Sequence, residues 1–309
     1  MPESHIVTGA GPVGWTVARQ LADDGQRVRV LTRSGTGPEH PNVERIRADV
    51  SDANQLAAHV AGATAVYHCI HGSKYSAKVW QAELPLAEQV VLAAAGANGA
   101  GAVFPESLYS YGRVDGVMSE DTPPTATTGK LGVRTELLRA RAASATPTVS
   151  VVASDFYGPR VLNAHMGERA VPKVIAGKTI RVMADADVAH SFTYVPDLAA
   201  AMIAAAADES RWNAVLHAPT APAVTQRQMI AAFARAADVP APKVGVIPVW
   251  LLKAMSPFST ELRELAETSY QFSAPFVMDS TKSERQLGLT PTPLTTAAAE
   301  TVAWWRSPR

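Results

Sequence analysis

The sequence has little of what marks secreted, membrane-spanning or nucleic-acid-binding proteins. Its 309 residues include a single cysteine, Cys69, which excludes an internal disulfide, and no basic and apolar leader precedes the first predicted strand. The 28 basic residues balance the 28 acidic ones, so no net positive charge favours nucleic acid or an anionic membrane. The most apolar stretch, residues 198–207, has about half of the roughly 20 residues that span a bilayer. We therefore predict a cytoplasmic protein whose partner is a small molecule.

The first 110 residues alternate short β-branched runs with longer helical patterns. This order is typical of right-handed βαβ units around a parallel sheet, and 47% hydrophobic residues are enough for a large core. The sequence therefore predicts an α/β protein with a Rossmann-like, doubly wound parallel sheet. The predicted strands are residues 5–9, 28–32, 43–48, 65–69, 101–104 and 149–153, with 192–195 and 213–218 returning to the sheet, and the predicted helices include 12–24, 53–61, 80–98 and 132–144.

A second, smaller lobe is predicted after the sixth strand, where prolines and glycines become frequent and the alternation loosens. We expect this lobe to be mainly helical and to bind the substrate. Residues 1–160 and 191–222 are assigned to the Rossmann domain, and residues 161–190 and 223–309 to the C-terminal lobe.

Polar residues stand where several helices should begin. Ser51 or Asp52 is the expected N-cap of the second helix, and Thr225 with Gln228 forms a capping box pattern. Asp197 is expected to cap the alanine-rich helix that follows it.

A glycine turn connects the first predicted strand to the first helix. Gly9, Gly11 and Gly14 match G-x-G-x-x-G in this context, which makes the pattern informative. Gly9 permits a tight turn, Gly11 lets backbone N–H groups approach a pyrophosphate, and Gly14 lets the helix lie close to the strand. We predict that this turn, with Pro12 and Val13, binds a dinucleotide.

The end of the second strand bears on which nicotinamide cofactor fits. An acidic residue there binds the ribose 2′-hydroxyl, whereas a basic residue accommodates a 2′-phosphate. The residues here are Arg33 and Ser34, without an acid, so we predict NADPH/NADP+ rather than NADH. Asp49 and Val50 follow the third strand, where Asp49 either accepts a hydrogen bond from the adenine amino group or only caps the next helix.

Five short motifs follow one another along the chain. They are VYHC at 66–69, SLYSYG at 107–112, SEDTP at 119–123, ASDFYGP at 153–159 and HSFTYVPD at 190–197. In this order they resemble the extended and atypical short-chain dehydrogenase/reductases, which are NAD-dependent epimerase/dehydratase-like proteins. The resemblance covers about two-thirds of the chain. It implies cofactor contacts at two strand ends, first from Cys69, Ile70 and His71 and then from Ser154, Asp155 and Phe156.

The sequence departs from this family at the catalytic residues. The usual members use serine, tyrosine and lysine, where the tyrosine exchanges the proton and the lysine lowers its pKa. Ser107 occupies the serine position, but the best alignment puts Thr128 at the tyrosine and Gly132 at the lysine. A shifted register keeps Lys130 as the lysine and puts Ala126 at the tyrosine. Neither register restores a tyrosine.

Loss of the tyrosine favours reduction over oxidation. Sugar epimerases and dehydratases first oxidise a secondary alcohol, which needs a base that Thr128 cannot be. Carbonyl reduction needs only an acid near the developing alkoxide. We therefore hypothesise NADPH-dependent reduction of a ketone on a bulky, aromatic polyketide-type metabolite, similar to the polyketide ketoreductases of the simocyclinone type. The substrate itself or water would provide the proton.

Few protein groups are candidates for contact with such a ketone. We expect Ser107 to contact the carbonyl and to lie beside the cofactor, and Tyr109 and His71 are the first candidates for a protein acid. Tyr111 and Tyr75 are further candidates in the same loops. No spacing among His, Asp and Glu predicts a metal site. Three histidines are interpreted as structural, namely His165, His190 and His217.

Two other functions fit the sequence. A redox-inert NADPH sensor or scaffold would also lack the catalytic pair, and consumption of the cofactor separates it from a reductase. A sugar-nucleotide epimerase or dehydratase would use a base that the motifs do not reveal. The helices at 80–98 and 132–144 show no decisive apolar outer face, so both a monomer and a homodimer remain open.

Overall fold

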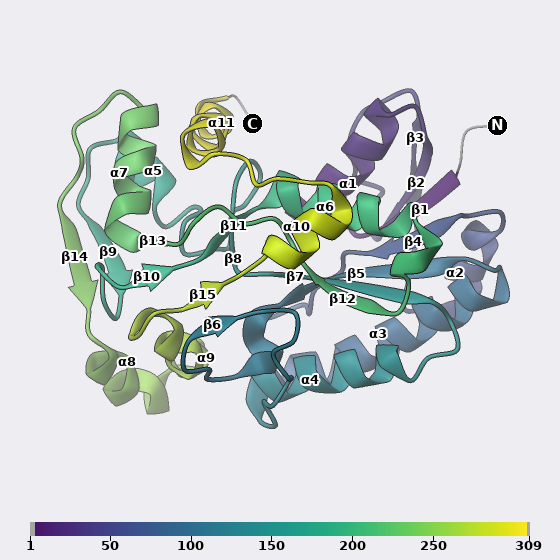
Figure 1. Cartoon of the computed structure of the whole chain (residues 1–309), viewed down its shortest axis with the longest axis horizontal. Coiled ribbons are helices and arrows are strands. Elements are labelled where there is room, and N and C mark those ends of the chain that lie inside the picture. Colours follow the sequence, from purple (N-terminus) through teal and green to yellow (C-terminus); the bar gives the residue numbers. More distant parts are fainter. Residues whose placement is uncertain (1–3, 308–309) are drawn as a thin grey trace.

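The computed structural model describes residues 4–307, apart from the side chains of Phe258 and Glu261. Seven parallel strands form one sheet in the order β12-β7-β5-β4-β1-β2-β3 (Figure 1). The predicted fold class is thereby confirmed. The strands are β1 (Ser4–Thr8), β2 (Arg27–Thr32), β3 (Val43–Arg47), β4 (Ala65–His68), β5 (Gly101–Ser107), β7 (Thr148–Ala153) and β12 (Ala214–His217).

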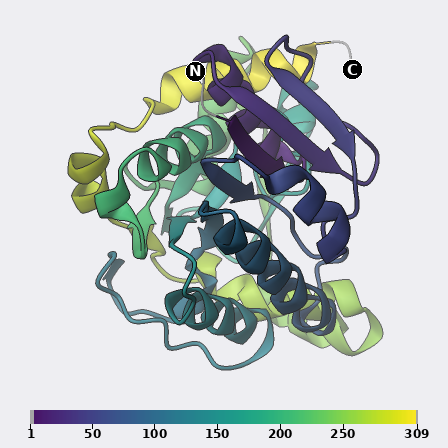
Figure 2. The same ribbon diagram turned by 90° about the vertical axis from the view of Figure 1, so that its right-hand side faces the viewer.

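Helices cover both faces of the sheet. Figures 1 and 2 show α1 (Pro12–Asp23) and α6 (Val195–Ala206) together on one face, with α2 (Ala53–Val60), α3 (Ala77–Ala97) and α4 (Gly129–Ala142) on the other. The strand order changes direction between β1 and β4. Doubly wound sheets bind their ligands outside the carboxyl ends of the strands beside such a point.

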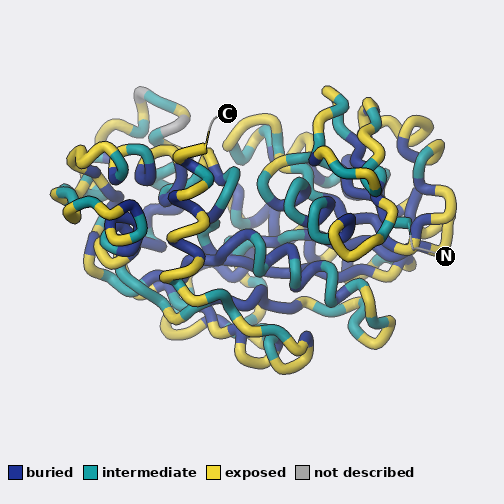
Figure 3. The backbone as a smooth tube through the Cα atoms, turned by 90° about the horizontal axis from the view of Figure 1, so that it is seen from above, coloured by how far each residue is buried: buried dark blue, intermediate teal, exposed yellow. Residues whose placement is uncertain are grey.

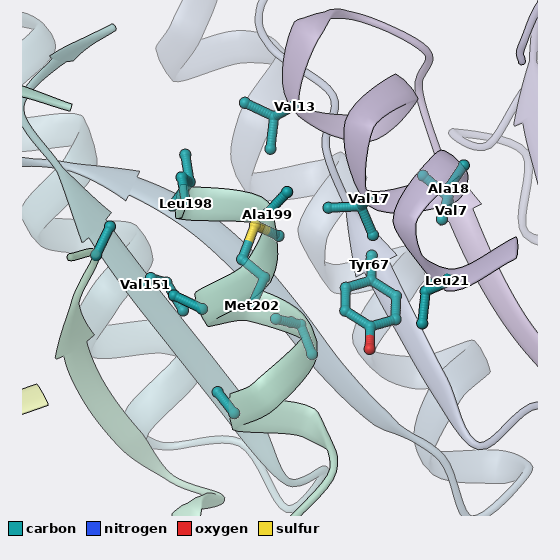
Figure 4. Packing of buried hydrophobic residues seen from close by; sticks show 14 of the residues in the cluster. Val7, Val13, Val17, Ala18, Leu21, Tyr67, Val151, Leu198, Ala199 and Met202 are labelled. Carbon is teal, nitrogen blue, oxygen red and sulfur yellow. The ribbon is translucent and has the colours of Figure 1, made fainter. Parts of the chain in front are cut away.

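Branched and small side chains fill the space between α1, α6 and the sheet. Val17 of α1 and Met202 of α6 are fully buried and belong to one cluster with Tyr67 of β4 (Figure 4). Figure 3 shows the same organisation along the whole chain, with buried strands in the middle and exposed residues on the outer turns and helices. This core holds the carboxyl ends of β1 and β4 in fixed positions.

The C-terminal elements gather at one end of the sheet (Figure 1). Their own core cluster includes Val174, Phe233 and Trp305. The predicted boundary between two lobes stays a prediction. The elements are α5 (Val171–Ile175), β9 (Ile180–Met183), β10 (Ala189–His190), β13 (Val224–Thr225), α7 (Gln226–Ala236), β14 (Val244–Ile247), α8 (Val249–Met255), α9 (Thr260–Thr268), β15 (Val277–Met278), α10 (Thr281–Leu287) and α11 (Leu294–Arg306).

Short strands also pair outside the main sheet. β6 (Val117–Met118) pairs with β15, and β8 (Asp155–Tyr157) pairs in parallel with β11 (Phe192–Tyr194). Among the helices of residues 4–307, none combines the length and the apolar character needed to cross a membrane.

Three local predictions are wrong. Residues 192–195 do not return to the main sheet, because β11 takes the adjacent β8 as its partner. Residues 161–190 hold one five-residue helix and two strands rather than a helical cap. Residues 165–170 form turns instead, in which the Gly167 N–H donates to the Ala164 carbonyl at 3.1 Å and a Cβ at Gly167 would lie 2.5 Å from the Leu162 carbonyl oxygen. Asp197 does not cap α6, which begins after Tyr194; its carboxylate accepts hydrogen bonds from Thr292 instead.

Other local predictions are confirmed. Asp52 is the N-cap of α2, and Thr225 and Gln228 form the capping box of α7. Residues 214–217 form β12 at the edge of the main sheet, within the predicted range. β5 extends three residues beyond the predicted strand, to Ser107.

Candidate active site

The glycine turn between β1 and α1 is sterically tight. The Gly9 N–H donates to the Leu31 carbonyl at 2.9 Å, and Gly9 has a φ of +88°, which favours glycine. A Cβ at Gly14 would lie 2.1 Å from the Gly9 carbonyl oxygen. Neither position can therefore accept a side chain without moving the backbone.

The same turn leaves space in front of α1. A Cβ at Gly11 would meet nothing within 4 Å, and Gly11 is the N-cap of α1 without a side chain that caps the helix. Beside it lies a cavity of about 360 Å³. The free N–H groups of the helix start suit a pyrophosphate, so the residues present fit a dinucleotide. The cavity is lined by Ala10, Gly11, Pro12, Trp15, Thr36, Gly37, Arg160, Leu162 and Trp304.

Arg160 is a cavity residue that sequence reasoning missed. Its guanidinium lies 3.8 Å from the centre of the Trp15 ring, and its φ of +67° is unusual for a residue with a side chain. The signal that could have found it is its place directly after the motif at 153–159. Trp304 reaches the cavity from α11, and no local pattern indicated this.

The predicted 2′-phosphate residues lie at the surface beyond β2. Arg33 and Ser34 are both exposed there, and the Ser34 hydroxyl lies 2.9 Å from that of Thr36. Asp49, after β3, accepts hydrogen bonds from the N–H and hydroxyl of Ser51, and these bonds lower its pKa, with a smaller effect from the charge of Arg33. Asp49 does not cap α2, whose N-cap is Asp52, so the predicted capping role of Asp49 is wrong, and its predicted contact with adenine stays a prediction. The side chain of Val50 is buried in the core.

Strand β4 ends against the glycine turn. A Cβ at Gly9 would lie 3.0 Å from the carbonyl oxygen of Cys69 and 3.0 Å from Cγ1 of Ile70. Burial raises the pKa of the Cys69 thiol, which therefore packs as a neutral group. The structure brings these two predicted cofactor residues together with the turn, whereas the Val13 side chain points into the core.

Ser107 lies at the carboxyl end of β5, opposite Ala153 of β7. Its N–H donates to the Glu106 carboxylate at 2.8 Å, and its hydroxyl to the same oxygen at 3.3 Å. Ser154 follows β7, but its hydroxyl donates to the Ser191 carbonyl at 2.6 Å. Of these two predicted site serines, Ser107 is the one whose hydroxyl lacks a short bond to the protein.

An aromatic cluster follows β4 and β5. The buried Trp80 meets the His71 ring edge-on at 4.6 Å and stacks with Tyr109 at 6.2 Å between ring centres. The hydroxyls of Tyr109 and Tyr75 are 2.8 Å apart. Surrounding protein atoms, and then the charge of Arg134, lower the pKa of His71 to about 4, although part of the ring reaches solvent. His71 is therefore neutral at pH 7.

Helix α4 begins at the position of the missing catalytic pair. Thr128 is its exposed N-cap, and Gly132 lies buried in its first turn. A Cβ at Gly132 would lie 2.5 Å from the carbonyl carbon of Thr127, so this position cannot carry a lysine in the present backbone. Two residues further along α4, Arg134 pairs with Glu106 at 3.5 Å.

Lys130, the lysine of the alternative register, is fully buried and joined to α9. Its Nζ lies 2.5 Å from the Glu267 carboxylate and contacts the Glu264 carboxylate. The N–H of Lys130 donates to Glu267 at 3.2 Å, and the N–H of Ala77 donates to Glu264 at 3.3 Å. The two carboxylates thus fasten α9 to the starts of α3 and α4, a contact that the sequence did not indicate.

Asp155 pairs with a histidine that the sequence analysis interpreted as structural. Nε2 of His190 lies 2.7 Å from Oδ2 of Asp155, and Nδ1 lies 3.0 Å from the Gln271 carbonyl. Burial by itself would raise the pKa of Asp155, but the hydrogen bond and charge of His190 outweigh it and lower the pKa. Phe156, the next predicted contact, is half-buried against the main core. Within residues 4–307, no group of three or more His, Cys, Asp or Glu side chains could hold a metal ion.

Comparison with known proteins gives a family and a fold. The sequence profile of the NAD dependent epimerase/dehydratase family matches residues 5–214. A search of curated proteins found no match. The Bordetella bronchiseptica enzyme WbmH, solved in complex with NAD+, is similar with a TM-score of 0.78 at 18% identity, over 99% of both chains.

Two further solved structures have the same fold. The Thermotoga maritima UDP-glucose 4-epimerase, solved with UDP-glucose, gives a TM-score of 0.78 at 17% identity over 98% of both chains. A double mutant of the Streptomyces venezuelae dTDP-glucose 4,6-dehydratase DesIV gives a TM-score of 0.75 at 20% identity, over 98% of this chain and 96% of the DesIV chain. At 17–20% identity these structures show a shared fold, which covers nearly the whole chain.

Proposed function

Because the chain belongs to the NAD dependent epimerase/dehydratase family, we propose that it is a nicotinamide-dependent oxidoreductase that reduces a ketone to an alcohol. Gly9, Gly11 and Gly14, together with Arg160, would hold the cofactor. When bound, the reduced cofactor supplies the hydride that the carbonyl carbon accepts. Ser107, at the end of β5, would donate a hydrogen bond to the carbonyl oxygen.

One observation favours reduction over epimerisation. The first turn of α4 has no room for a side chain at Gly132, and the nearby Lys130 is held by two carboxylates. No tyrosine stands at Thr128 to remove a proton from an alcohol. Without such a base, the oxidation that begins epimerisation or dehydration lacks its proton acceptor, whereas a carbonyl needs only an acid.

The charges around the site favour an uncharged substrate. Lys130 pairs with two glutamates, Arg134 pairs with Glu106, and His190 pairs with Asp155. A diphosphate would have to compete with these carboxylates for Lys130, Arg134 and His190, whereas Arg113 and Arg160 lie over aromatic rings. Aromatic rings lie beside the same strand ends, so we propose a bulky aromatic ketone of the polyketide type. The rings that reach the surface are Tyr75, Tyr109 and Tyr270, whereas Trp80 and Phe272 are buried among protein side chains.

NADPH is the proposed cofactor. Arg33 is exposed at the end of β2, and the residues that follow β2 up to Thr36 include no acid to bind a 2′-hydroxyl. A guanidinium suits the additional phosphate of NADPH, because it donates several hydrogen bonds in a planar arrangement.

A sugar-nucleotide epimerase or dehydratase is the second candidate. Its support is the similarity to solved enzymes with these activities over 96–98% of their chains. Such an activity would require a base other than the missing tyrosine and a site for the diphosphate.

Cofactor consumption tests the proposal. Purified protein would be mixed with NADPH and either hydroxylated quinone-type ketones or the nucleotide sugars UDP-glucose and dTDP-glucose. We expect the absorbance of the reduced nicotinamide to fall only with the ketones. The matched control is Gly11→Val, which adds a side chain in open space and should keep the fold while blocking the pyrophosphate.

Two results would contradict the proposed reduction. One is conversion of a nucleotide sugar with no activity on any ketone, which would establish the second candidate. The other is tight NADPH binding, lost in Gly11→Val, without consumption in the presence of either substrate class. That result would identify a sensor or scaffold.

A further inference from the structure

We infer that the Asp155–His190 pair donates the proton to the carbonyl oxygen of the substrate. This inference rests on the proposed ketone reduction, and it puts a protein group in place of substrate or water as the proton source. The pair combines a stored proton, a position beside Ser107 and one member that reaches solvent.

The stored proton follows from the hydrogen-bond partners. Nδ1 of His190 lies 3.0 Å from the Gln271 carbonyl, which can only accept, so Nδ1 carries a hydrogen. Nε2 lies 2.7 Å from Oδ2 of Asp155, and this contact needs a second hydrogen, on Nε2 or on the carboxyl group. The pair therefore holds one proton more than a neutral imidazole and a carboxylate. Without it, two lone pairs would face each other at 2.7 Å.

The surroundings keep this proton in the pair until an acceptor arrives. The His190 ring stacks on Phe272 at 4.4 Å between ring centres and lies 5.3 Å from Phe276, and its side chain is 1% exposed. Asp155 is 18% exposed, so it is the member through which the proton can leave. An imidazolium beside a carboxylate forms a pair with no net charge, and a paired charge costs less free energy to bury than an isolated one.

Asp155 lies at the strand ends where the ketone is proposed to bind. It follows Ala153 by two residues, and Ala153 is the partner of Ser107 across β5 and β7. Burial is the main cause of the raised pKa values of Tyr109 and of Tyr270, the latter to about 12, and the negative charge of Asp155 adds to both shifts. Phe276 packs against the His190 ring at 5.3 Å and against the Tyr270 ring at 6.2 Å between centres, and the Tyr270 hydroxyl donates to the Gly112 carbonyl at 3.0 Å, so the pair lies near the loop that follows β5.

The other acids at this edge give up a proton less readily. Burial raises the pKa of the Cys69 thiol. Protein atoms around the partly exposed Tyr75 and His71 raise the pKa of the phenol and lower the pKa of the imidazole to about 4, which leaves that ring neutral. His165 packs edge-on against Phe272, and burial lowers its pKa as well, with the charge of Asp155 opposing the shift. The extra proton of the Asp155–His190 pair has no counterpart in these groups.

The proposed step balances. The carbonyl carbon accepts a hydride from the reduced nicotinamide, the electrons of the C=O π bond move to oxygen, and the oxygen takes the proton from the Asp155 carboxyl group. That proton is the one extra proton of the pair: it passes from Nε2 of His190 to the Asp155 carboxylate and from there to the substrate oxygen, so a neutral imidazole and a carboxylate remain. One proton from solvent then restores the pair, and an alcohol and the oxidised nicotinamide leave.

Nuclear magnetic resonance of the free protein tests the stored proton without any turnover. Nitrogen-15 spectra of the 8 histidines at neutral pH should show one imidazole with both ring nitrogens protonated. The signal should vanish in His190→Gln. A spectrum in which all imidazoles are neutral tautomers, or in which the doubly protonated ring survives in His190→Gln, overturns the inference.

Kinetics test the transfer itself. In Asp155→Asn, kcat for ketone reduction should fall roughly 10²–10⁴-fold with little change in KM, as expected when an acid is lost. The wild-type rate should be slower in D₂O, a readout that a merely structural role would not change. Asp187→Asn is the matched control, since it removes the carboxylate of an exposed ion pair with Arg227 and should keep the wild-type rate. A larger loss in Tyr109→Phe than in Asp155→Asn would overturn the assignment.

The two levels of the hypothesis fail differently. If the wild-type protein reduces no ketone, the proposed function fails, and the imidazole spectrum still decides whether the pair stores a proton. If the wild type reduces ketones but Asp155→Asn keeps its rate, the function stands and the donor is wrong. Thermal unfolding of Asp155→Asn checks that a slow variant is folded.

Discussion

The two halves of the site are built by different physical means. The cofactor half depends on the backbone between Gly9 and Gly14, where close contacts exclude side chains. The substrate half depends on charged side chains from distant parts of the chain, such as Lys130 with Glu264, 134 residues later. Changes in the first half should therefore act through steric overlap, and changes in the second through charges left buried without a partner.

This difference also bears on how the halves are coupled. The glycine turn packs closely against the ends of neighbouring strands, whereas α9 is held to α3 and α4 by the carboxylates of Glu264 and Glu267. We expect a defect in the turn to remain local. A defect in the charged contacts should loosen the C-terminal elements from the sheet.

The largest effect is expected for Lys130→Met. The substitution leaves the Glu264 and Glu267 carboxylates without their cation, and breaking a buried pair in this way costs about 3–5 kcal/mol. The free energy of unfolding from urea denaturation measures the loss. Adding Glu264→Gln to Lys130→Met should recover part of it, because one of the unpaired charges is removed.

The control for this prediction is Lys282→Met. Lys282 also pairs with a carboxylate, that of Asp121 at 2.8 Å, but the two side chains are 46% and 78% exposed. Such a surface pair contributes about 0–1 kcal/mol. Equal losses of unfolding free energy in Lys130→Met and Lys282→Met would show that the buried ion pairs of Lys130 contribute no more than the exposed pair of Lys282.

In the cofactor half, Gly14→Ala should have the next largest effect. A methyl group 2.1 Å from the Gly9 carbonyl oxygen forces the turn to move, and overpacking of this kind costs about 1–3 kcal/mol. Gly11→Ala adds the same methyl group in open space, so its stability should stay within about 0.5 kcal/mol of wild type. Both variants should bind cofactor less tightly in a fluorescence titration. A destabilised Gly11→Ala would mean that the turn is packed differently.

The same contrast explains what the sequence predicted. The sheet, the glycine turn and the caps at Asp52 and Thr225 follow from periodicity and from residue preferences within a few positions. The Asp155–His190 pair was not anticipated, because a histidine within HSFTYVPD gives no sign of its partner 35 residues earlier. Nothing in the sequence around Glu264 indicates a distant lysine. Pairing of side chains across the fold is set by tertiary packing, which local patterns do not encode.

Acid should weaken the cofactor half through His68, which ends β4 beside Thr8. Burial, the main cause, lowers the pKa of His68 from 6.5 to about 4. Between these values the unfolded chain binds more protons than the folded one, so stability falls as the pH falls. From pH 7 to pH 5 this group should account for a loss of about 2 kcal/mol.

His68→Asn isolates this contribution from that of other histidines. Denaturation at pH 7 and pH 5 should show a smaller loss in the variant than in the wild type, by about 2 kcal/mol. An equal loss in both proteins would show that His68 titrates normally in the folded state. The Lys130 contacts, which contain no histidine, should not contribute to the difference.

The smallest effect is expected for Arg33→Ala, because Arg33 is exposed and its contact with a ligand is screened by water. The change removes no packing, so the free energy of unfolding should stay within about 0.5 kcal/mol of wild type. The ratio of NADPH to NADH affinity should nevertheless fall roughly tenfold, which is about 1.4 kcal/mol of binding free energy. Titrations with both cofactors measure the ratio, and Arg45→Ala, which removes another exposed arginine, should leave it unchanged. An unchanged ratio in Arg33→Ala would mean that the open end of β2 does not select the cofactor, and preference for NADPH would then have to arise elsewhere in the cavity, where Arg160 is the nearest candidate.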